Sequence, residues 1–220
     1  MKTISVIPAW NEAKRIASVI RNVKPVVDQV VVVDDCSLDN TRLIAEQEGA
    51  VVLRHLVNRD QGAALRTGTK YAIKHGADII VHFDADGQMR AEDIPVVIQP
   101  ILNGEADVVF GSRFLDQKTN MPAFKRYVIM PLAKLVNMIF LRVKLTDPQS
   151  GFRALSRKAA EQIDWKQDGK AHCSEILALV HKQKLRIVEV PVTIIYHNFG
   201  QKLSGGFRIL KDMILSKLIN

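Results

Sequence analysis

Short apolar runs alternate with longer segments in which apolar residues recur every three or four positions. The short runs are rich in Val and Ile and predict buried strands, whereas the longer segments predict amphipathic helices. The expected strands are Ile4–Ile7, Val30–Val33, Val51–Leu53, Ile79–Phe83 and Val108–Phe110. The expected helices are Glu12–Asn22, Asn40–Glu48, Gln61–Lys74 and Glu92–Asn103. This alternation predicts an α/β fold with a mainly parallel sheet and helices on both faces.

The alternation fades after about residue 119. A basic, Met-rich helical stretch is followed by a turn at Ser150–Phe152, a helix near Ser174–Lys182 and a strand pair near Ile187–Tyr196. No linker rich in Pro, Gly or Ser and no internal repeat interrupts the chain. We therefore expect one domain over residues 1–220, with a first half of about 1–118 and a second half of about 119–220.

The net charge of +8, from 31 Lys and Arg against 23 Asp and Glu, indicates an anionic partner. Nucleic acid, an acidic membrane surface and a phosphorylated small molecule all carry that charge. Only 6% of the chain is aromatic, and no RNA-recognition or zinc-finger pattern occurs, so we expect no nucleic-acid partner. Cys36 and Cys173 lack paired spacing and predict reduced thiols in a cytoplasmic protein.

The first residues enter a strand without the features of a signal peptide, so secretion is not expected. The longest apolar stretch, Tyr127–Leu141, is interrupted by Pro131 and Lys134 and predicts no transmembrane helix. Between Phe207 and Ile219, apolar residues share one helical face and basic residues lie elsewhere. Such an amphipathic helix lies on an anionic membrane or docks against the protein's own core or a dimer partner.

Two carboxylates, Asp84 and Asp86, stand one residue apart at the end of the apolar run Ile79–Phe83. Because alternate side chains of a strand point to the same side, both carboxylates can converge on one hard cation. Solvated aspartates at a strand end are the alternative. An EF-hand loop is excluded, since Gly87 is its fourth residue and Pro95 its twelfth. A haloacid dehalogenase is disfavoured because its acidic motif lies near the start of the chain.

Other polar residues follow the expected strands. Asp34 and Asp35 end the second strand, where a dinucleotide-binding unit holds a ribose, but that unit also needs a Gly-x-Gly-x-x-Gly loop after its first strand. This chain has 8–12, Pro-Ala-Trp-Asn-Glu, in that place, which disfavours a nicotinamide or flavin enzyme. Two ambiguities remain at this point. Ser37, Asp39 and Asn40 can simply cap a helix, and Gly62 and Gly68 can serve either helix packing or close approach to a nucleotide.

Five segments, taken together, resemble the family 2 glycosyltransferases, and within them the dolichyl-phosphate mannose synthases and polyprenyl-phosphate glycosyltransferases. They occur in the family's order within about residues 3–200 and are 7–12, 33–41, 84–88, 111–114 and 147–154. The resemblance implies the Rossmann-like GT-A fold, a nucleotide-sugar donor, Mg²⁺ or Mn²⁺, and inversion at the anomeric carbon. The first half would bind the nucleotide sugar and the second half the acceptor.

The resemblance also implies roles for single residues. Those that would bind the nucleotide are Pro8, Trp10, Glu12, Asp35 and Asp84, with Asp35 at the base. Those that would hold the metal are Asp84, Asp86 and Gln88. A cation there would stabilise the charge on the departing nucleoside diphosphate. Trp10 stands where the family usually has Tyr, so it keeps a flat stacking face but lacks a hydroxyl.

The acceptor side follows from the same resemblance. Asp147 and Arg113 would act in catalysis, and Arg126, or alternatively Lys125, would grip the acceptor phosphate. If the acceptor is a sugar hydroxyl, Asp147 would remove its proton. A lipid phosphate is already anionic and needs positioning more than deprotonation.

Residues 189–203 resemble a closing segment that brings cationic side chains over the diphosphate. Where relatives carry arginine, this chain has His197 and Phe199, and Lys202 is the remaining fixed cation. His197 substitutes when protonated or is an ordinary exposed histidine.

The expected function is metal-dependent transfer of a hexose from a UDP- or GDP-sugar to a polyprenyl phosphate. The expected location is the cytoplasmic face of a membrane, with peripheral contact and a possible homodimer. Two alternatives are transfer to a sugar hydroxyl during polysaccharide or glycolipid synthesis, and a non-catalytic nucleotide-sugar-binding protein.

Overall fold

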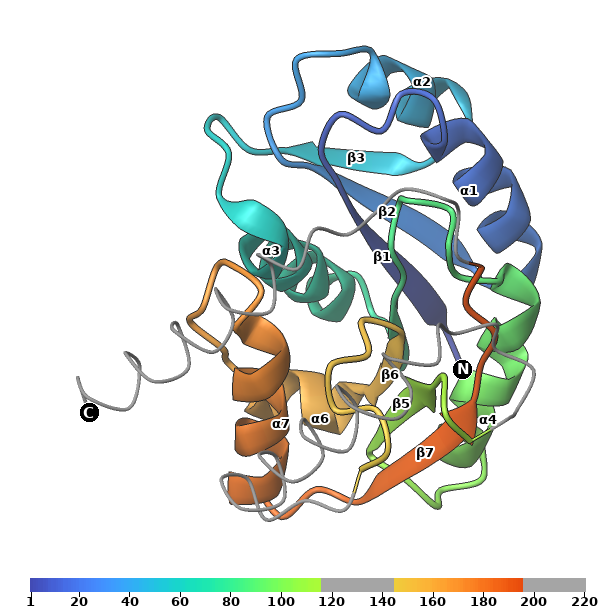
Figure 1. Ribbon diagram of the computed structural model, residues 1–220, viewed down its shortest axis with the longest axis vertical. Coiled ribbons are helices and arrows are strands. Elements are labelled where there is room, and N and C mark those ends of the chain that lie inside the picture. The colour runs from blue at the N-terminus through green and yellow to red at the C-terminus, as the bar shows by residue number, and fades with distance from the viewer. Residues whose placement is uncertain (116–144, 196–220) are drawn as a thin grey trace, which may run out of the picture.

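The computed structural model describes residues 1–115 and 145–195 (Figure 1). Its strands are β1 Thr3–Ala9, β2 Gln29–Asp34, β3 Val51–Arg54, β4 Ile79–His82, β5 Val108–Ser112, β6 Arg153–Ser156 and β7 Ile187–Pro191. Its α-helices are α1 Ile16–Val23, α2 Thr41–Gln47, α3 Asp60–Lys74, α4 Ile94–Leu102, α6 Arg157–Gln162 and α7 His172–Lys182. Two 3₁₀ turns, η1 Lys24–Val26 and η2 Ala91–Asp93, precede β2 and α4.

The described strands form one sheet of seven in the order β3-β2-β1-β4-β6-β5-β7. β1 pairs in parallel with β2 and β4, β2 with β3, and β5 with β7. β6 runs antiparallel between β4 and β5. The expected α/β fold with a mainly parallel sheet is thus confirmed.

The second half differs from the expected elements. β6 and α6 were not expected, because β6 has only four residues and begins with the charged Arg153. The strand pair expected near Ile187–Tyr196 is wrong. β7 pairs with β5, and Ile194 forms only an isolated bridge with Met89.

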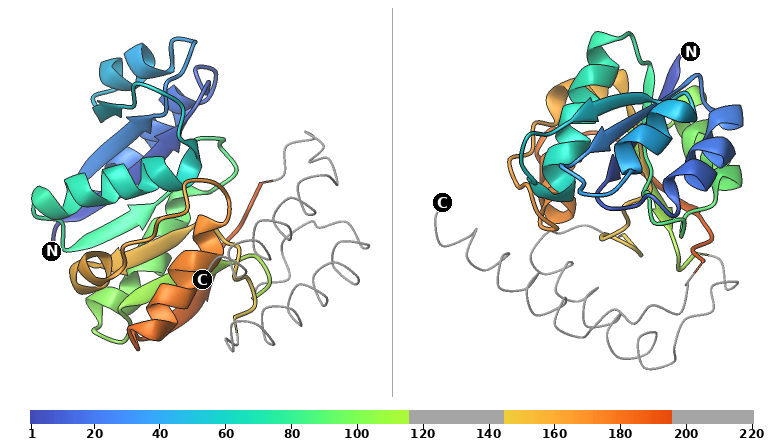
Figure 2. Two further views of the ribbon diagram at one scale, coloured as in Figure 1. Left: turned by 90° about the vertical axis from the view of Figure 1, so that its left-hand side faces the viewer. Right: turned by 90° about the horizontal axis from the view of Figure 1, so that it is seen from above.

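Helices cover both faces of the sheet (Figures 1 and 2). Apolar residues of α1, α2 and α4 pack in one core cluster, and those of α3, α6 and α7 pack in the other. β1 serves both, since Ile4 and Val6 enter the second cluster while Ile7 enters the first. Each of these side chains is fully buried, which stabilises the fold by about 1.5–3 kcal/mol per residue.

α3 lies directly against the sheet because Gly68 faces β1. A Cβ atom at Gly68 would stand 2.2 Å from Val6 Cγ1, too close for any side chain. At Gly62, a Cβ would stand 2.4 Å from the carbonyl oxygen of Gln167. Both glycines therefore serve helix packing, the first of the two roles left open by the sequence.

Several expectations fall on residues outside the described ranges. They concern Lys125, Arg126, His197, Lys202, the apolar stretch 127–141 and the amphipathic segment 207–219. Within the described part of the chain, no helix combines the length and hydropathy needed to cross a membrane.

Candidate active site

The polar loops of the first half converge at the edge of the sheet where the parallel strands β1, β2 and β4 end. The strand register pairs Ala9 with Asp34 and Val6 with His82, so the three strands finish close together. β6 runs the opposite way, and Arg153 at its start pairs with His82. The segment 145–152 therefore reaches the same edge from the second half of the chain.

The acid pair follows β4 at this edge. Asp84 Oδ1 accepts a 2.7 Å hydrogen bond from Gln61 Nε2 on α3. Asp86 Oδ1 accepts from the backbone N–H of Gln88 at 2.9 Å, in a turn where Gly87 has φ +74°. Burial and the negative charge of Asp86 raise the pKa of Asp84 to about 7. The two acids thus repel each other in a half-buried position.

These residues fit a divalent cation. Within residues 1–115 and 145–195, no lysine or arginine forms an ion pair with Asp84 or Asp86, so negative charge remains to be neutralised there. The same residues contain no cluster of three or more His, Cys, Asp or Glu that could hold a metal alone. Mg²⁺ is commonly held by one or two carboxylates, with substrate phosphates and water completing its shell. The donor set fits a cation that arrives with a diphosphate.

A buried polar cluster lies behind the acid pair. Arg153 is fully buried, and its Nη2 donates to Cys173 Sγ at 3.2 Å. Burial raises the pKa of Cys173, but Arg153 and His172 together, through their charges and hydrogen bonds, outweigh burial and lower that pKa to about 6. His82 is also fully buried, and its Nε2 is 2.9 Å from Thr69 Oγ1. The sequence did not single out Arg153 or His82, since only the antiparallel pairing of β6 with β4 brings them together.

The loops after β1 and β2 are joined by side chain to backbone hydrogen bonds. The N–H of Asn11 donates to Ser37 Oγ at 2.9 Å, and the N–H of Leu38 donates to Asn11 Oδ1 at 2.8 Å. Asp39 accepts from the N–H of Ala13 at 3.1 Å and from that of Thr41 at 3.0 Å. Ser37 and Asp39 therefore connect the two loops, and only Asp39 also bonds the first turn of α2. Asn40 makes no side-chain cap.

The residues expected to bind the nucleotide lie on these loops in different environments. Trp10 is 55% exposed, whereas Pro8 is buried within β1. Glu12 Oε2 accepts from Arg15 Nη1 at 2.9 Å, and its carbonyl accepts from the N–H groups of Arg15 and Ile16. Residues 12–15 thus form a turn ahead of α1, which begins at Ile16 rather than at the expected Glu12.

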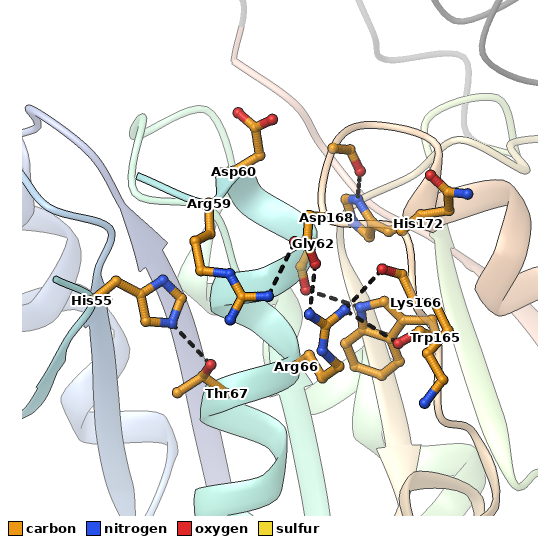
Figure 3. Close-up of polar contacts among 12 residues, drawn as sticks. His55, Arg59, Asp60, Gly62, Arg66, Thr67, Trp165, Lys166, Asp168 and His172 are labelled. Atoms are coloured by element: carbon orange, nitrogen blue, oxygen red, sulfur yellow. Dashed lines mark hydrogen bonds and ion pairs between the residues drawn. The ribbon is translucent and has the colours of Figure 1, made fainter. Parts of the chain in front are cut away.

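Asp35 is nearly buried, and its carboxylate joins β2 to the loop before α3. Its Oδ1 lies 2.7 Å from His55 Nδ1, and both oxygens accept from the N–H of Arg59, at 2.9 and 3.1 Å. His55 Nε2 is in turn 2.9 Å from Thr67 Oγ1 on α3 (Figure 3). The base-binding role of Asp35 stays a prediction, but its structural role is plain.

Asp147 and Arg113 come together as expected for two residues of one site. Asp147 is 1% exposed, and the guanidinium of Arg113 donates to it twice, from Nε at 2.6 Å and from Nη2 at 2.7 Å. Glu189 on β7 accepts from the N–H groups of Thr146 and Asp147 at 2.7 and 2.9 Å. A carboxylate held by two charge-assisted bonds is well ordered, which suits orientation of an anionic acceptor better than removal of a proton.

Comparisons with known proteins point to one family. The family described as "Glycosyl transferase family 2" matches residues 5–164. A UDP-N-acetylglucosamine–dolichyl-phosphate N-acetylglucosaminyltransferase of Methanococcus voltae is 36% identical over 97% of this chain and 95% of its own length. An undecaprenyl-phosphate mannosyltransferase of Micrococcus luteus is 30% identical over 94% of this chain and 89% of its own length.

A solved structure with the same architecture is glucosyl-3-phosphoglycerate synthase from Mycobacterium tuberculosis, in complex with Mn²⁺ and UDP-glucose. It aligns with a TM-score of 0.73 and 25% identity, covering 98% of this chain and 78% of that one. The likeness confirms the GT-A fold that the sequence resemblance implied.

Proposed function

Because this chain belongs to glycosyl transferase family 2 and is a glycosyltransferase, we propose that it transfers a hexose or N-acetylhexosamine from a UDP- or GDP-sugar to a polyprenyl phosphate, with inversion. The observation that carries this proposal is the unneutralised acid pair Asp84 and Asp86 at the edge where the strands end. Relatives that match nearly the whole chain bear the names of enzymes acting on dolichyl and undecaprenyl phosphates.

On the donor side, Asp84, Asp86 and Gln88 would hold Mg²⁺ or Mn²⁺. When bound, the cation stabilises negative charge on the nucleoside diphosphate as the glycosidic bond breaks. Trp10 offers an exposed aromatic face on which a base can stack. Pro8, Glu12 and Asp35 line the same edge of the sheet.

On the acceptor side, a phosphate oxygen is already anionic, so the protein has to orient it. Arg113 and Asp147 form a fixed pair at this edge, where the guanidinium supplies positive charge and the carboxylate fixes its plane. Arg126 or Lys125 would add a further contact to the phosphate, and His197 and Lys202 would close over the diphosphate.

A polyprenyl acceptor requires access to a membrane surface. The net charge of +8 favours contact with anionic lipid, and the amphipathic pattern of residues 207–219 favours peripheral attachment at the cytoplasmic face. Docking against the protein's own core or against a dimer partner is the competing use of that pattern.

An assay with a short polyprenyl phosphate in detergent micelles tests this function. UDP-glucose, UDP-N-acetylglucosamine and GDP-mannose are each supplied with Mg²⁺ or Mn²⁺, and lipid-linked sugar is measured by mass spectrometry. We expect product with one donor and none after chelation of the metal. Product only with sugar acceptors would favour the polysaccharide alternative. Tight nucleotide-sugar binding without turnover of any acceptor would favour a binding protein.

A further inference from the structure

Gln61, in the first turn of α3, forms a hydrogen bond with Asp84 of the acid pair. We propose that Gln61 is a positioning residue that fixes the carboxylate of Asp84 for the divalent cation, an inference that rests on the proposed function. Its Nε2 lies 2.7 Å from Asp84 Oδ1. An amide orients a carboxylate without neutralising it, whereas a lysine or arginine in this place would compete with the cation.

The position of Gln61 is fixed because the first turn of α3 is bound to the segment 164–169. The N–H of Gly62 donates to the carbonyl of Asp168 at 2.6 Å, and Trp165 Nε1 donates to the carbonyl of Gly62 at 2.9 Å (Figure 3). Trp165 is 1% exposed, so this second bond is shielded from water. Gly62, the next residue after Gln61, is thus held by two hydrogen bonds, one through its N–H and one through its carbonyl.

Charged side chains strengthen the same contact. Asp168 accepts from Arg66 Nη2 at 2.5 Å and from Arg59 Nη2 at 3.2 Å. Arg66 Nη1 also donates to the carbonyls of Trp165 and Lys166, both at 3.2 Å. As Figure 3 shows, Arg59 and Arg66 reach Asp168 from the helix side. Residues about one hundred positions apart therefore hold the start of α3 in one place.

Asp84 is confined on its other side as well. A Cβ atom at Gly151 would stand 3.0 Å from Asp84 Oδ2 and 3.5 Å from Oδ1. The carboxylate thus lies between the amide of Gln61 and the backbone of Gly151, which leaves little room for rotation. Loss of the amide removes the one side-chain hydrogen bond described for this carboxylate in residues 1–115 and 145–195.

The test compares Mn²⁺ binding by the wild type, Gln61→Met and Gln61→Ala. Met keeps the length of the side chain and removes the hydrogen-bond donor. Ala removes the donor without introducing a new side chain, so weaker Mn²⁺ binding by both variants cannot be due to a poor fit of Met. Free Mn²⁺ is measured by electron paramagnetic resonance in the presence of UDP or GDP. We expect both variants to bind Mn²⁺ about tenfold more weakly, as is typical when a group supporting a metal ligand is lost.

Gln162→Met is the matched control, since Gln162 is exposed at the end of α6, and α6 begins at the opposite edge of the sheet. It should bind Mn²⁺ like the wild type. Thermal unfolding without metal should change little in every variant, and turnover by the Gln61 variants should recover at high Mn²⁺. Wild-type affinity for Mn²⁺ in both Gln61 variants would overturn the inference alone. Absence of Mn²⁺ binding by the wild type would overturn the proposed metal site, and the inference with it.

Discussion

Aspartates at the two edges of the sheet have pKa values that are shifted in opposite directions. Where the parallel strands end, burial and Asp86 raise the pKa of Asp84 to about 7. Where β5 begins, at the other edge, hydrogen bonds from Arg186 lower the pKa of Asp107 to about 2. The first acid is left with a charge that a cation can neutralise, and the second is neutralised by the protein itself. The difference separates the edge at which we propose donor binding, called the binding edge below, from an edge that serves stability.

Asp147 is an intermediate case. It lies at the same edge as the acid pair, yet it accepts two hydrogen bonds from the guanidinium of Arg113, as Asp107 does from that of Arg186. Position along the strand therefore does not decide the role of an acid. The presence or absence of a guanidinium partner does.

The contrast between the two edges requires that the negative charge of the acid pair is needed for activity. Asp86→Asn keeps the size of the side chain and an acceptor for the N–H of Gln88, but removes one negative charge. We expect kcat/KM to fall about 100- to 1000-fold. The free energy of unfolding should stay the same or rise, because repulsion with Asp84 is relieved. Lipid-linked sugar formation and urea unfolding measure the two effects, and activity close to that of the wild type would contradict the prediction.

Removal of Arg113 tests whether Asp147 behaves like the acids of the stabilising edge. Arg113→Ala leaves a buried carboxylate without its guanidinium, and because Arg113 itself is 24% exposed, we expect a loss of about 2–3 kcal/mol in the free energy of unfolding. The matched control is Arg157→Ala, which removes the exposed pair between Arg157 and Glu161 on α6 and should cost about 0.3–0.5 kcal/mol. Equal losses in urea unfolding would show that the burial of Asp147 has no energetic consequence.

The contribution of Asp107 to stability, at the opposite edge, can be tested by measuring unfolding as a function of pH. The pKa of Asp107 is about 2 in the folded protein against an ordinary value of 3.8, so its ionised form stabilises the native state. This stabilisation, about 2 kcal/mol, is complete above about pH 4 and is lost as the pH falls toward 2. Asp107→Asn should remove that part of the acid dependence. Urea unfolding between pH 2 and 6 checks it, and parallel curves for the two proteins would refute the assignment.

The smallest expected effect comes from changing Trp10, which should weaken donor binding without lowering stability. Trp10 is 55% exposed at the binding edge, so Trp10→Ala should leave the unfolding temperature unchanged. Loss of stacking should raise the KM for the nucleotide sugar about tenfold. Trp10→Tyr keeps an aromatic face and should stay near the wild-type KM. A variant Trp10→Ala that unfolds more easily but binds the donor normally would assign Trp10 to the fold.

The sequence predicts β1 to β5 well because each of these strands contains a run that is mostly apolar and rich in Val or Ile. It also predicts the acid pair, since Asp84 and Asp86 follow such a run directly and stand one residue apart. It does not predict β6, which has four residues and starts with a buried arginine, a residue rarely buried.

Contacts between distant segments are equally hidden from the sequence. Gln61 and Asp84 are 23 positions apart, and Arg113 and Asp147 are 34 apart. Neither pair follows from the spacing within one helix or strand. Such pairs can be identified only once the strand order and the position of α3 against the sheet are known.

The reversed direction of β6 has one more consequence. A parallel strand there would deliver residues 147–151 to the far rim, about 13 Å away, since four residues advance roughly 3.3 Å each. Instead, β6 begins at the edge where β4 ends, so Gly151, just before β6, lies against Asp84. Residues 145–152, from the second half of the chain, thus reach the edge of the sheet that the acid pair occupies, and a change in this segment can alter the surroundings of Asp84 without changing β1, β2 or β4.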